Sequence, residues 1–427
     1  MMRTILTLLA GFAVGLPVGL LAQSPSRTDT LLARLTAEAV ATAPAIRRSD
    51  AMARAASARI RPAGALPDPM MSAGVMDLTL PNFRFHESDF TEVDVELSQQ
   101  IPWPGTLGAQ TRAAQATALS AAANVSELRR EIALRVAMLY YRLRYLVTAQ
   151  QTLAHQRGLL QTGVEVSTAR YGTGSVAQSD PLLARVALAR LGAEEAALGA
   201  EEAGLRADLK ALRGVKRSEQ LDIAPIASDS VYTVIAGDSL HAAHLAAARP
   251  LETHPRLEAA RASLEAARQT VTAEALGGRP DFEFSARYGA RPLGSDFFSA
   301  FIGIRLPLWA GRKQRRLVEA AQLDAEAAQH ALEEDESALG AELERTLAEA
   351  QAGELRLNLL VESVLPAARE GVQSVLRGYR VGQTEFLSVL MAEDALYRAE
   401  LETAQVASEH LTHLVMLELL LGPEESH

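Results

Sequence analysis

The chain has 427 residues, a formal net charge of −10, no cysteine and only 5% aromatic residues. This length allows two or three ordinary domains or one large architecture, and the composition, rich in Ala, Leu, Glu and Arg, is typical of long helices or coiled coils. The negative charge argues against a nucleic-acid partner, because a phosphate backbone requires clustered Lys and Arg, and the lack of cysteine excludes disulfides and a lipid-modified cysteine.

The N-terminus predicts a secretory signal peptide over residues 1–22. A single Arg3 precedes an apolar run from Ile5 to Leu21, which ends in small and polar residues. A membrane-anchoring helix is the alternative, but three glycines and Pro17 weaken a stable span, and the run is short for a bilayer. No later run is long and apolar enough to cross a membrane as a helix, so membrane contact is expected from strands or an amphipathic surface.

The remaining sequence is organised as two similar halves, 23–214 and 253–422, joined by a linker at 215–252 and followed by a tail at 423–427. A shift of 208 positions superimposes identical residues of the two halves. The pairs include Tyr171 with Tyr379, Gly174 with Gly382, Ala184 with Ala392, Arg190 with Arg398, Leu209 with Leu417 and Gly214 with Gly422. The linker has no clear periodicity and is interpreted as a belt around the middle of the molecule.

Each half predicts the same series of elements: a helix, two strands, a Pro-Gly corner, a very long helix, a turn and a shorter helix. The first half places them at 29–60, 69–80, 90–101, 106–171 and 183–213, and the second at 253–278, 281–289, 297–306, 312–381 and 391–421. At 1.5 Å per residue each long helix reaches about 100 Å. The shorter helix of each half covers only part of it, which leaves room for the first helix to lie in line.

The long helices carry coiled-coil signals. In the first, apolar residues recur every seven positions, which predicts a seam that packs laterally: Val125, Ile132, Leu139, Leu146, Leu153 and Leu160. In the second, the apolar stripe is interrupted by Pro366, which lacks a backbone N–H and is expected to kink the helix.

The four strand segments alternate apolar and polar residues. Val93, Val95 and Leu97 alternate with Glu92, Asp94 and Glu96, and the strand at 281–289 alternates in the same way. A soluble sheet with one wet face is one interpretation, but strands of about ten residues also suit a tilted outer-membrane strand. Four strands do not close a barrel and open edges do not occur in lipid, so a membrane location requires several copies; three copies would contribute twelve strands.

Two corners and two turns carry a resemblance to a known family. The corners are PWPG at 102–105 and LPLWAG at 306–311, and the turns are the Tyr-x-x-Gly patterns at Tyr171 and Tyr379. With the duplicated plan, these motifs make the sequence resemble the TolC family of outer-membrane efflux proteins over essentially the whole mature chain. The corner IPWPGTL looks most like the branch that includes the CzcC and CusC subunits of heavy-metal efflux systems.

The resemblance implies a mostly α-helical homotrimer with a shared 12-stranded β-barrel in the outer membrane, four strands per chain, and a long α-helical coiled-coil barrel in the periplasm of a Gram-negative bacterium. It implies a passive exit duct that meets a periplasmic adaptor (membrane fusion) protein and an inner-membrane transporter. Neither enzyme activity nor a cofactor is expected. Heavy-metal cations are the favoured cargo, with drug efflux and type I secretion as alternatives.

The resemblance also assigns sites. The periplasmic tip and adaptor-docking residues would be Tyr171, Gly174, Ser175, Asp180, Tyr379, Gly382 and Gln383. The candidate gate residues are Asp180, Glu385 and Ser388, where Ser388 stands at a position that is commonly Asp in the family, and Glu393 and Asp394 are further acidic candidates. The barrel-to-helix corners would be formed by Pro102, Pro104, Gly105, Pro307 and Gly311.

Alternatives remain at two levels. A periplasmic coiled-coil adaptor would share the long helical hairpins, although it needs no strands with a lipid-like face. Two histidine pairs, His241 with His244 and His410 with His413, share a helical face and suit a metal, but solvated or inter-helix histidines are favoured. Met70, Met71 and Met76 suit a soft metal or equally a lipid-facing or core position.

Overall fold

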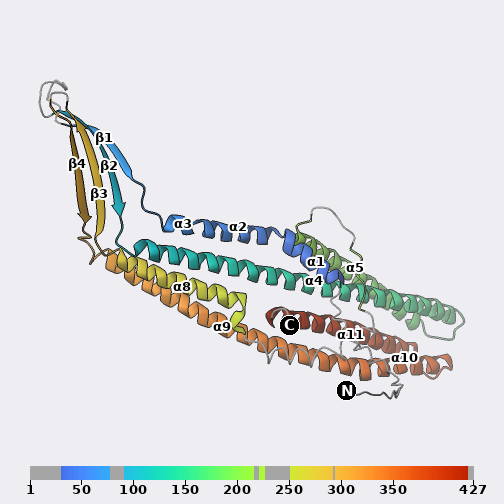
Figure 1. Ribbon diagram of the computed structural model, residues 1–427. Coiled ribbons are helices and arrows are strands. Elements are labelled where there is room, and N and C mark those ends of the chain that lie inside the picture. The colour runs from blue at the N-terminus through green and yellow to red at the C-terminus, as the bar shows by residue number, and fades with distance from the viewer. Residues whose placement is uncertain (1–29, 77–90, 216–220, 227–250, 292–293, 422–427) are drawn as a thin grey trace, which may run out of the picture.

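The computed structural model describes residues 30–76, 91–215, 221–226, 251–291 and 294–421. They form an elongated molecule with a four-stranded sheet at one end and a bundle of long helices that runs away from it (Figure 1). The predicted signal peptide, the tail at 423–427 and the pair His241 and His244 lie outside the described residues.

The two halves contain the same series of elements. The first half has α1 (Thr30–Thr42), α2 (Pro44–Ala58), α3 (Ile60–Ala63), β1 (Met70–Met76), β2 (Glu92–Ile101), α4 (Thr106–Gly172) and α5 (Ser179–Arg213). The second has α8 (Pro255–Leu276), β3 (Asp281–Ala290), β4 (Phe297–Arg305), α9 (Gln314–Leu359), a π-helical turn (Leu360–Val364), α10 (Leu365–Arg380) and α11 (Phe386–Leu421).

Prolines explain two differences from the expected helix bounds. The first helix is divided at Ala43, whose extended backbone (φ −54°, ψ 124°) reflects the exclusion of helical geometry before Pro44. The shorter helix of the first half begins at Ser179 rather than 183, since Pro181 is tolerated in a first helical turn. In the second half the shorter helix begins at Phe386 rather than 391, and Phe386 is buried.

The helical bundle is built around α4. This helix contacts α2, α5, α8 and α11, while α9 contacts α8 and α11. Along α4, α1 and α2 lie in line with α5, and along α9, α8 lies in line with α11 (Figure 1). The short helices therefore cover consecutive parts of each long helix, because neither α5 nor α11 reaches its full length.

The heptad seam of α4 is the inner face of the bundle. Five of its positions are buried and Leu139 is partly buried; the buried ones are Val125, Ile132, Leu146, Leu153 and Leu160. The described part of the linker adds Leu221, Ile223 and Ile226 to the same apolar clusters. Burial of one apolar stripe over this length stabilises helices that would be marginal alone.

The second long helix changes its hydrogen-bond pattern next to Pro366. The π-helical turn at Leu360–Val364 directly precedes α10, in which Pro366 is the second residue. Because proline offers no N–H to the preceding turn, a local change from the regular pattern accommodates it.

The sheet joins the two halves of the chain. Its order is β1-β2-β3-β4 and all three pairings are antiparallel. The central pairing joins β2 of the first half to β3 of the second, with Val93 opposite Ala290 and Ile101 opposite Phe282. Among the described helices, none is both long and apolar enough to cross a membrane.

Candidate functional site

The two faces of the sheet have an unusual distribution of polarity. One face presents apolar side chains to the outside, for example Ile302 with 72% of its surface exposed, while Asp94 on the opposite face is only 5% exposed. The register places these apolar residues opposite one another: Ala73, Val95, Tyr288 and Phe298 form one row across the four strands. In water such a sheet would expose its apolar side, so an apolar surrounding is the environment that it fits.

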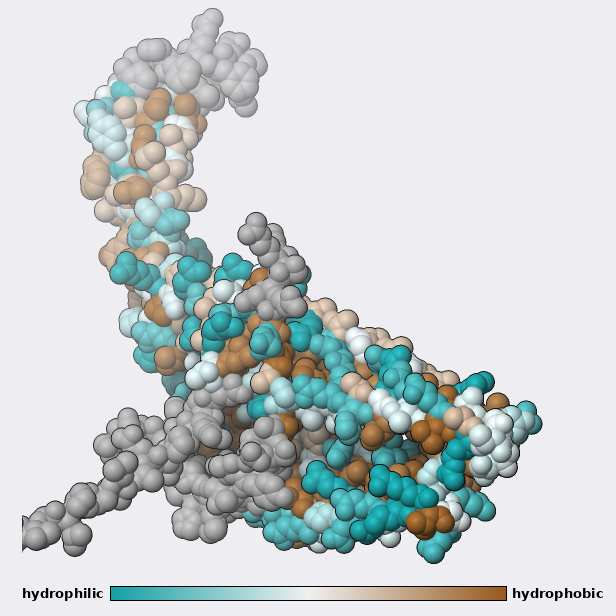
Figure 2. All heavy atoms as spheres, turned by 90° about the vertical axis from the view of Figure 1, so that its right-hand side faces the viewer, coloured by the Kyte–Doolittle hydropathy of each residue, from teal (hydrophilic) through white to brown (hydrophobic). Residues whose placement is uncertain are grey.

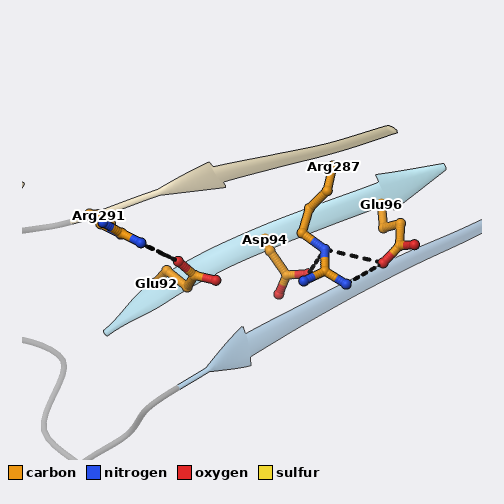
Figure 3. A network of polar contacts seen from close by, with 5 residues as sticks. All are labelled: Glu92, Asp94, Glu96, Arg287 and Arg291. Carbon is orange, nitrogen blue, oxygen red and sulfur yellow. Dashed lines mark hydrogen bonds and ion pairs between the residues drawn. The ribbon is translucent and has the colours of Figure 1, made fainter. Parts of the chain in front are cut away.

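The polar face carries a charge network across β2 and β3 (Figure 3). Glu92, Asp94 and Glu96 project from alternate positions of β2, and two arginines reach them from the β3 side. Arg287 lies 2.6 Å from Glu96 and 3.7 Å from Asp94, and Arg291 lies 3.3 Å from Glu92. The three carboxylates are thus paired with two guanidinium groups across the junction between the two halves, and a charged network of this kind suits the wall of an aqueous lumen.

The opposite end of the molecule is formed by two helical turns. Gly174 and Gly382 have φ values of 71° and 75°, in the left-handed region that glycine adopts without strain. In both turns the residue after this glycine donates its N–H back to the helix: Ser175 to the Arg170 carbonyl at 2.9 Å and Gln383 to the Gly378 carbonyl at 2.8 Å. Both helices therefore end in the same C-terminal capping motif.

A cleft of about 400 Å³ lies between the two turns. Its walls come from both halves: Arg170, Ser175, Val176, Ala177, Ser179, Asp180 and Leu183 from the first, and Tyr379, Gly382, Thr384, Glu385, Phe386 and Leu387 from the second. The guanidinium carbon of Arg170 lies 4.8 Å from the centre of the Tyr379 ring, and the rings of Tyr379 and Phe386 are 5.8 Å apart. Viewed from this end, polar and apolar residues are intermixed (Figure 2).

The structure brings together only part of the residues expected at this end. Asp180 and Glu385 line the same cleft, whereas Ser388 is exposed one residue beyond its wall. Glu393 is buried, and this burial raises the pKa of its carboxyl group. Asp394 is exposed and pairs with Arg398 at 2.8 Å.

Arg170, Thr384 and Phe386 are among the cleft residues that were not expected from the sequence. Thr384 donates its hydroxyl to the Val375 carbonyl at 3.1 Å, and Phe386 is buried beneath the turn. Phe386 is the one aromatic residue in the polar stretch QTEFLS, and that isolation was the available signal.

The two corners differ in backbone. Gly105 has a φ of 96° and caps α4, so it occupies a conformation that other residues adopt with strain. Gly311 has no such value; its corner is a chain of turns in which Ala310 donates to the Pro307 carbonyl at 3.0 Å and Lys313 to the Trp309 carbonyl at 2.9 Å. These turns delay the start of α9 to Gln314, two residues after the expected position.

The metal-ligand candidates that the structure describes point in different directions. Nδ1 of His410, a buried residue, lies 3.1 Å from the Ala350 carbonyl, while Nε2 of His413 lies 3.4 Å from Glu349. Met70, Met71 and Met76 are exposed on the sheet. Within the described ranges, no group of three or more His, Cys, Asp or Glu side chains is arranged to hold a metal ion.

Comparison with known proteins agrees with this geometry. Residues 248–423 match the family described as Outer membrane efflux protein. The matched region is the second half of the chain, from the residues just before α8 to the end of α11.

Solved structures of outer-membrane channels share the fold of this chain over nearly its whole length. The channel OprN matches with 20% identity and a TM-score of 0.77, covering 92% of this chain and 90% of its own. CusC matches with 17% identity and a TM-score of 0.78, covering 92% of both chains. VceC from Vibrio cholerae matches with 21% identity and a TM-score of 0.76, covering 93% of this chain and 97% of its own.

These matches confirm the predicted fold class, with mostly helical chains that each contribute four antiparallel strands. Identities to OprN, CusC and VceC are similar, so they favour no single branch of the family. No curated protein matches the sequence significantly.

Proposed function

We propose that three copies of this chain assemble into the passive exit duct of a tripartite efflux pump. The observation that carries this is the sheet: its exposed face is apolar, and its first and last strands, β1 and β4, each pair with one neighbour within the described chain. Sheet edges in lipid must be paired, so the four strands require strands from other copies. Three copies supply twelve strands, a number that forms a barrel in outer membranes.

The helical end is the proposed docking place for a periplasmic adaptor. The cleft between the turns is open, is lined by both halves and exposes the apolar Leu183 and Leu387 beside Asp180 and Glu385. An adaptor that contacts both turns would fix their separation. Asp180 and Glu385 are the proposed acidic residues of the gate, because they share this cleft, and the π-helical turn before Pro366 is the proposed bend when the mouth opens.

For the cargo we propose heavy-metal cations, delivered by an inner-membrane transporter. The support is the corner IPWPGTL, which looks most like the heavy-metal branch, together with a net charge of −10 that favours cations near the protein. Deletion of the gene should raise sensitivity to heavy-metal cations and leave sensitivity to organic drugs unchanged. The opposite pattern would assign the duct to drug efflux.

Extraction tests the duct itself. The protein should remain in the outer-membrane fraction until detergent is added, and cross-linking in the membrane should stop at the mass of three chains. An adaptor would instead be recovered from the periplasm without detergent. That result would contradict the proposal.

A further inference from the structure

The second corner exposes a group of large apolar side chains. Leu308 is 80% exposed and Trp309 is 71% exposed, and Leu306 before them is also exposed. Leu306 continues the row of Ile302 and Ile304 at every second position, so the apolar face of β4 extends into the corner without interruption. The corner thus lies where the sheet meets the long helices (Figure 1).

Four cations follow these apolar residues directly. They are Arg312, Lys313, Arg315 and Arg316, all exposed, and the stretch from 306 to 316 contains no acidic residue. Arg316 pairs with Glu319, whereas the other three have no ion pair within the part of the chain that the structure describes. Arg315 and Arg316 occupy the first turn of α9, where the helix dipole disfavours positive charge. Helix stability therefore does not explain these cations.

The first corner provides an internal comparison. Residues 101–111, IPWPGTLGAQT, contain no charged side chain. Trp103 is only partly exposed and stacks on Phe282, with ring centroids 5.9 Å apart. The duplication preserved the corner, but only its second copy combines an exposed indole with a cluster of cations.

We infer that the segment Leu306–Arg316 binds the headgroups of anionic phospholipids in the periplasmic leaflet of the outer membrane. Trp and Leu side chains lie favourably at a bilayer interface, and Lys and Arg beside a membrane attract anionic lipid headgroups. The site is continuous with the apolar sheet face, and its charge is complementary to a phosphate-bearing surface. This inference rests on the proposed function, since it requires that the sheet lies in the membrane.

Tryptophan fluorescence can test the contact, because the chain has two tryptophans. The W103F variant, full length and reconstituted in bilayers, leaves Trp309 as the single reporter. Brominated phosphatidylglycerol should quench Trp309 more strongly than brominated phosphatidylcholine. Removing two cations in R312Q/R315Q should lower this preference by at least about fivefold. In the W103F protein that keeps all four cations, 1 M NaCl should also lower the preference.

A matched control removes two cations at the opposite end. Arg377 and Arg380 are exposed in the last turn of α10, so R377Q/R380Q should leave the lipid preference unchanged. Absence of quenching by either lipid would place Trp309 against a neighbouring subunit and overturn the inference. Equal quenching by both lipids, an equal loss in the control, or full competition by inorganic phosphate would overturn headgroup recognition.

Two readouts separate this inference from the proposed function. If R312Q/R315Q does not insert, the salt dependence of the W103F protein still decides the question. A protein that does not float with lipid vesicles contradicts the proposed duct. A protein that floats but shows no headgroup preference contradicts only the lipid site.

Discussion

The two helical turns at the end of the molecule far from the sheet share one backbone conformation and differ in what they bury. Each has a glycine in the left-handed region and the same return hydrogen bond. Yet Tyr171 of the first turn is exposed, whereas its counterpart Tyr379 is partly buried between Arg170 and Phe386. The second turn therefore supplies the packed aromatic residues of this end, and the first supplies Arg170, which lies over the Tyr379 ring.

The same division appears in the caps of the first helices. Ala43 precedes Pro44 at the start of α2 without a side-chain cap, whereas His254 precedes Pro255 at the start of α8 and accepts a hydrogen bond from the Arg256 N–H at 3.2 Å. Duplication thus retained prolines and glycines that direct the backbone. The side chains beside them diverged, so each half has different packing and electrostatics at equivalent places.

The largest expected effect comes from removing the packed aromatic of the second turn. Phe386→Ala should destabilise the tip by about 3–5 kcal/mol, because a buried ring that contacts Tyr379 is replaced by a cavity. Limited proteolysis at the turn and chemical denaturation in detergent would measure the loss. The equivalent position of the first half is Gln178, which is exposed, so Gln178→Ala should change little. Similar losses in both variants would contradict the asymmetry.

The next effect concerns pH and His254. Burial, with help from Arg130 and Arg256, lowers the pKa of His254 from 6.5 to about 4, so the folded protein holds this side chain neutral. Between these values the unfolded chain binds the extra proton. The contribution of His254 to the free energy of unfolding is therefore fully present above about pH 6.5. It is lost as the pH falls towards 4, by up to about 3 kcal/mol.

His254→Ala, which copies Ala43 of the first half, tests this assignment. It should cost about 1 kcal/mol at neutral pH through the lost cap. It should also flatten the stability profile between pH 6.5 and 4, measured by denaturation at each pH. An unchanged slope would show that other groups cause the acid sensitivity.

A smaller effect is expected at the glycines of the turns. Gly382→Val and Gly174→Val should each cost about 1–2 kcal/mol from backbone strain alone, since no atom lies within 4 Å of either added Cβ. Gly382→Val should also weaken efflux while the barrel stays folded. Gly371→Val is the control, because Gly371 is helical with open space around it and its substitution should be neutral or slightly stabilising. Normal efflux by Gly382→Val would contradict a role for this turn in docking.

Local sequence signals predicted the backbone well. The spacing of Val125 and Ile132 predicts the buried seam because heptad position determines the face of a helix. The Gly-containing turns and the alternating strands follow from equally local preferences. Contacts between distant segments did not follow: Arg170 meets Tyr379 across more than 200 residues, and the sequence contains no local sign of that contact.

The helix ends show the same limit. The start of α9 at Gln314 depends on hydrogen bonds to the carbonyls of Trp309 and Pro307 in the corner. The position of Gly311 in the sequence does not predict these hydrogen bonds. His410 and His413 are spaced to share one helical face, but their environments differ. His410 lies against the Ala350 carbonyl, whereas His413 lies beside Glu349. Periodicity identifies faces, whereas the partners of each face are determined by three-dimensional packing.

The smallest effect is the coupling between the two turns through Arg170 and Tyr379. A guanidinium over an aromatic ring at a partly exposed site contributes about 0.5–1 kcal/mol. A double-mutant cycle with Arg170→Met and Tyr379→Leu should yield a coupling energy of this size, measured by denaturation in detergent. The cycle of Arg170→Met with Tyr171→Leu is the matched control and should yield no coupling, since Tyr171 is exposed in the same turn. Equal coupling in both cycles would mean that Arg170 acts through the first turn alone, and that the turns are not linked by this contact.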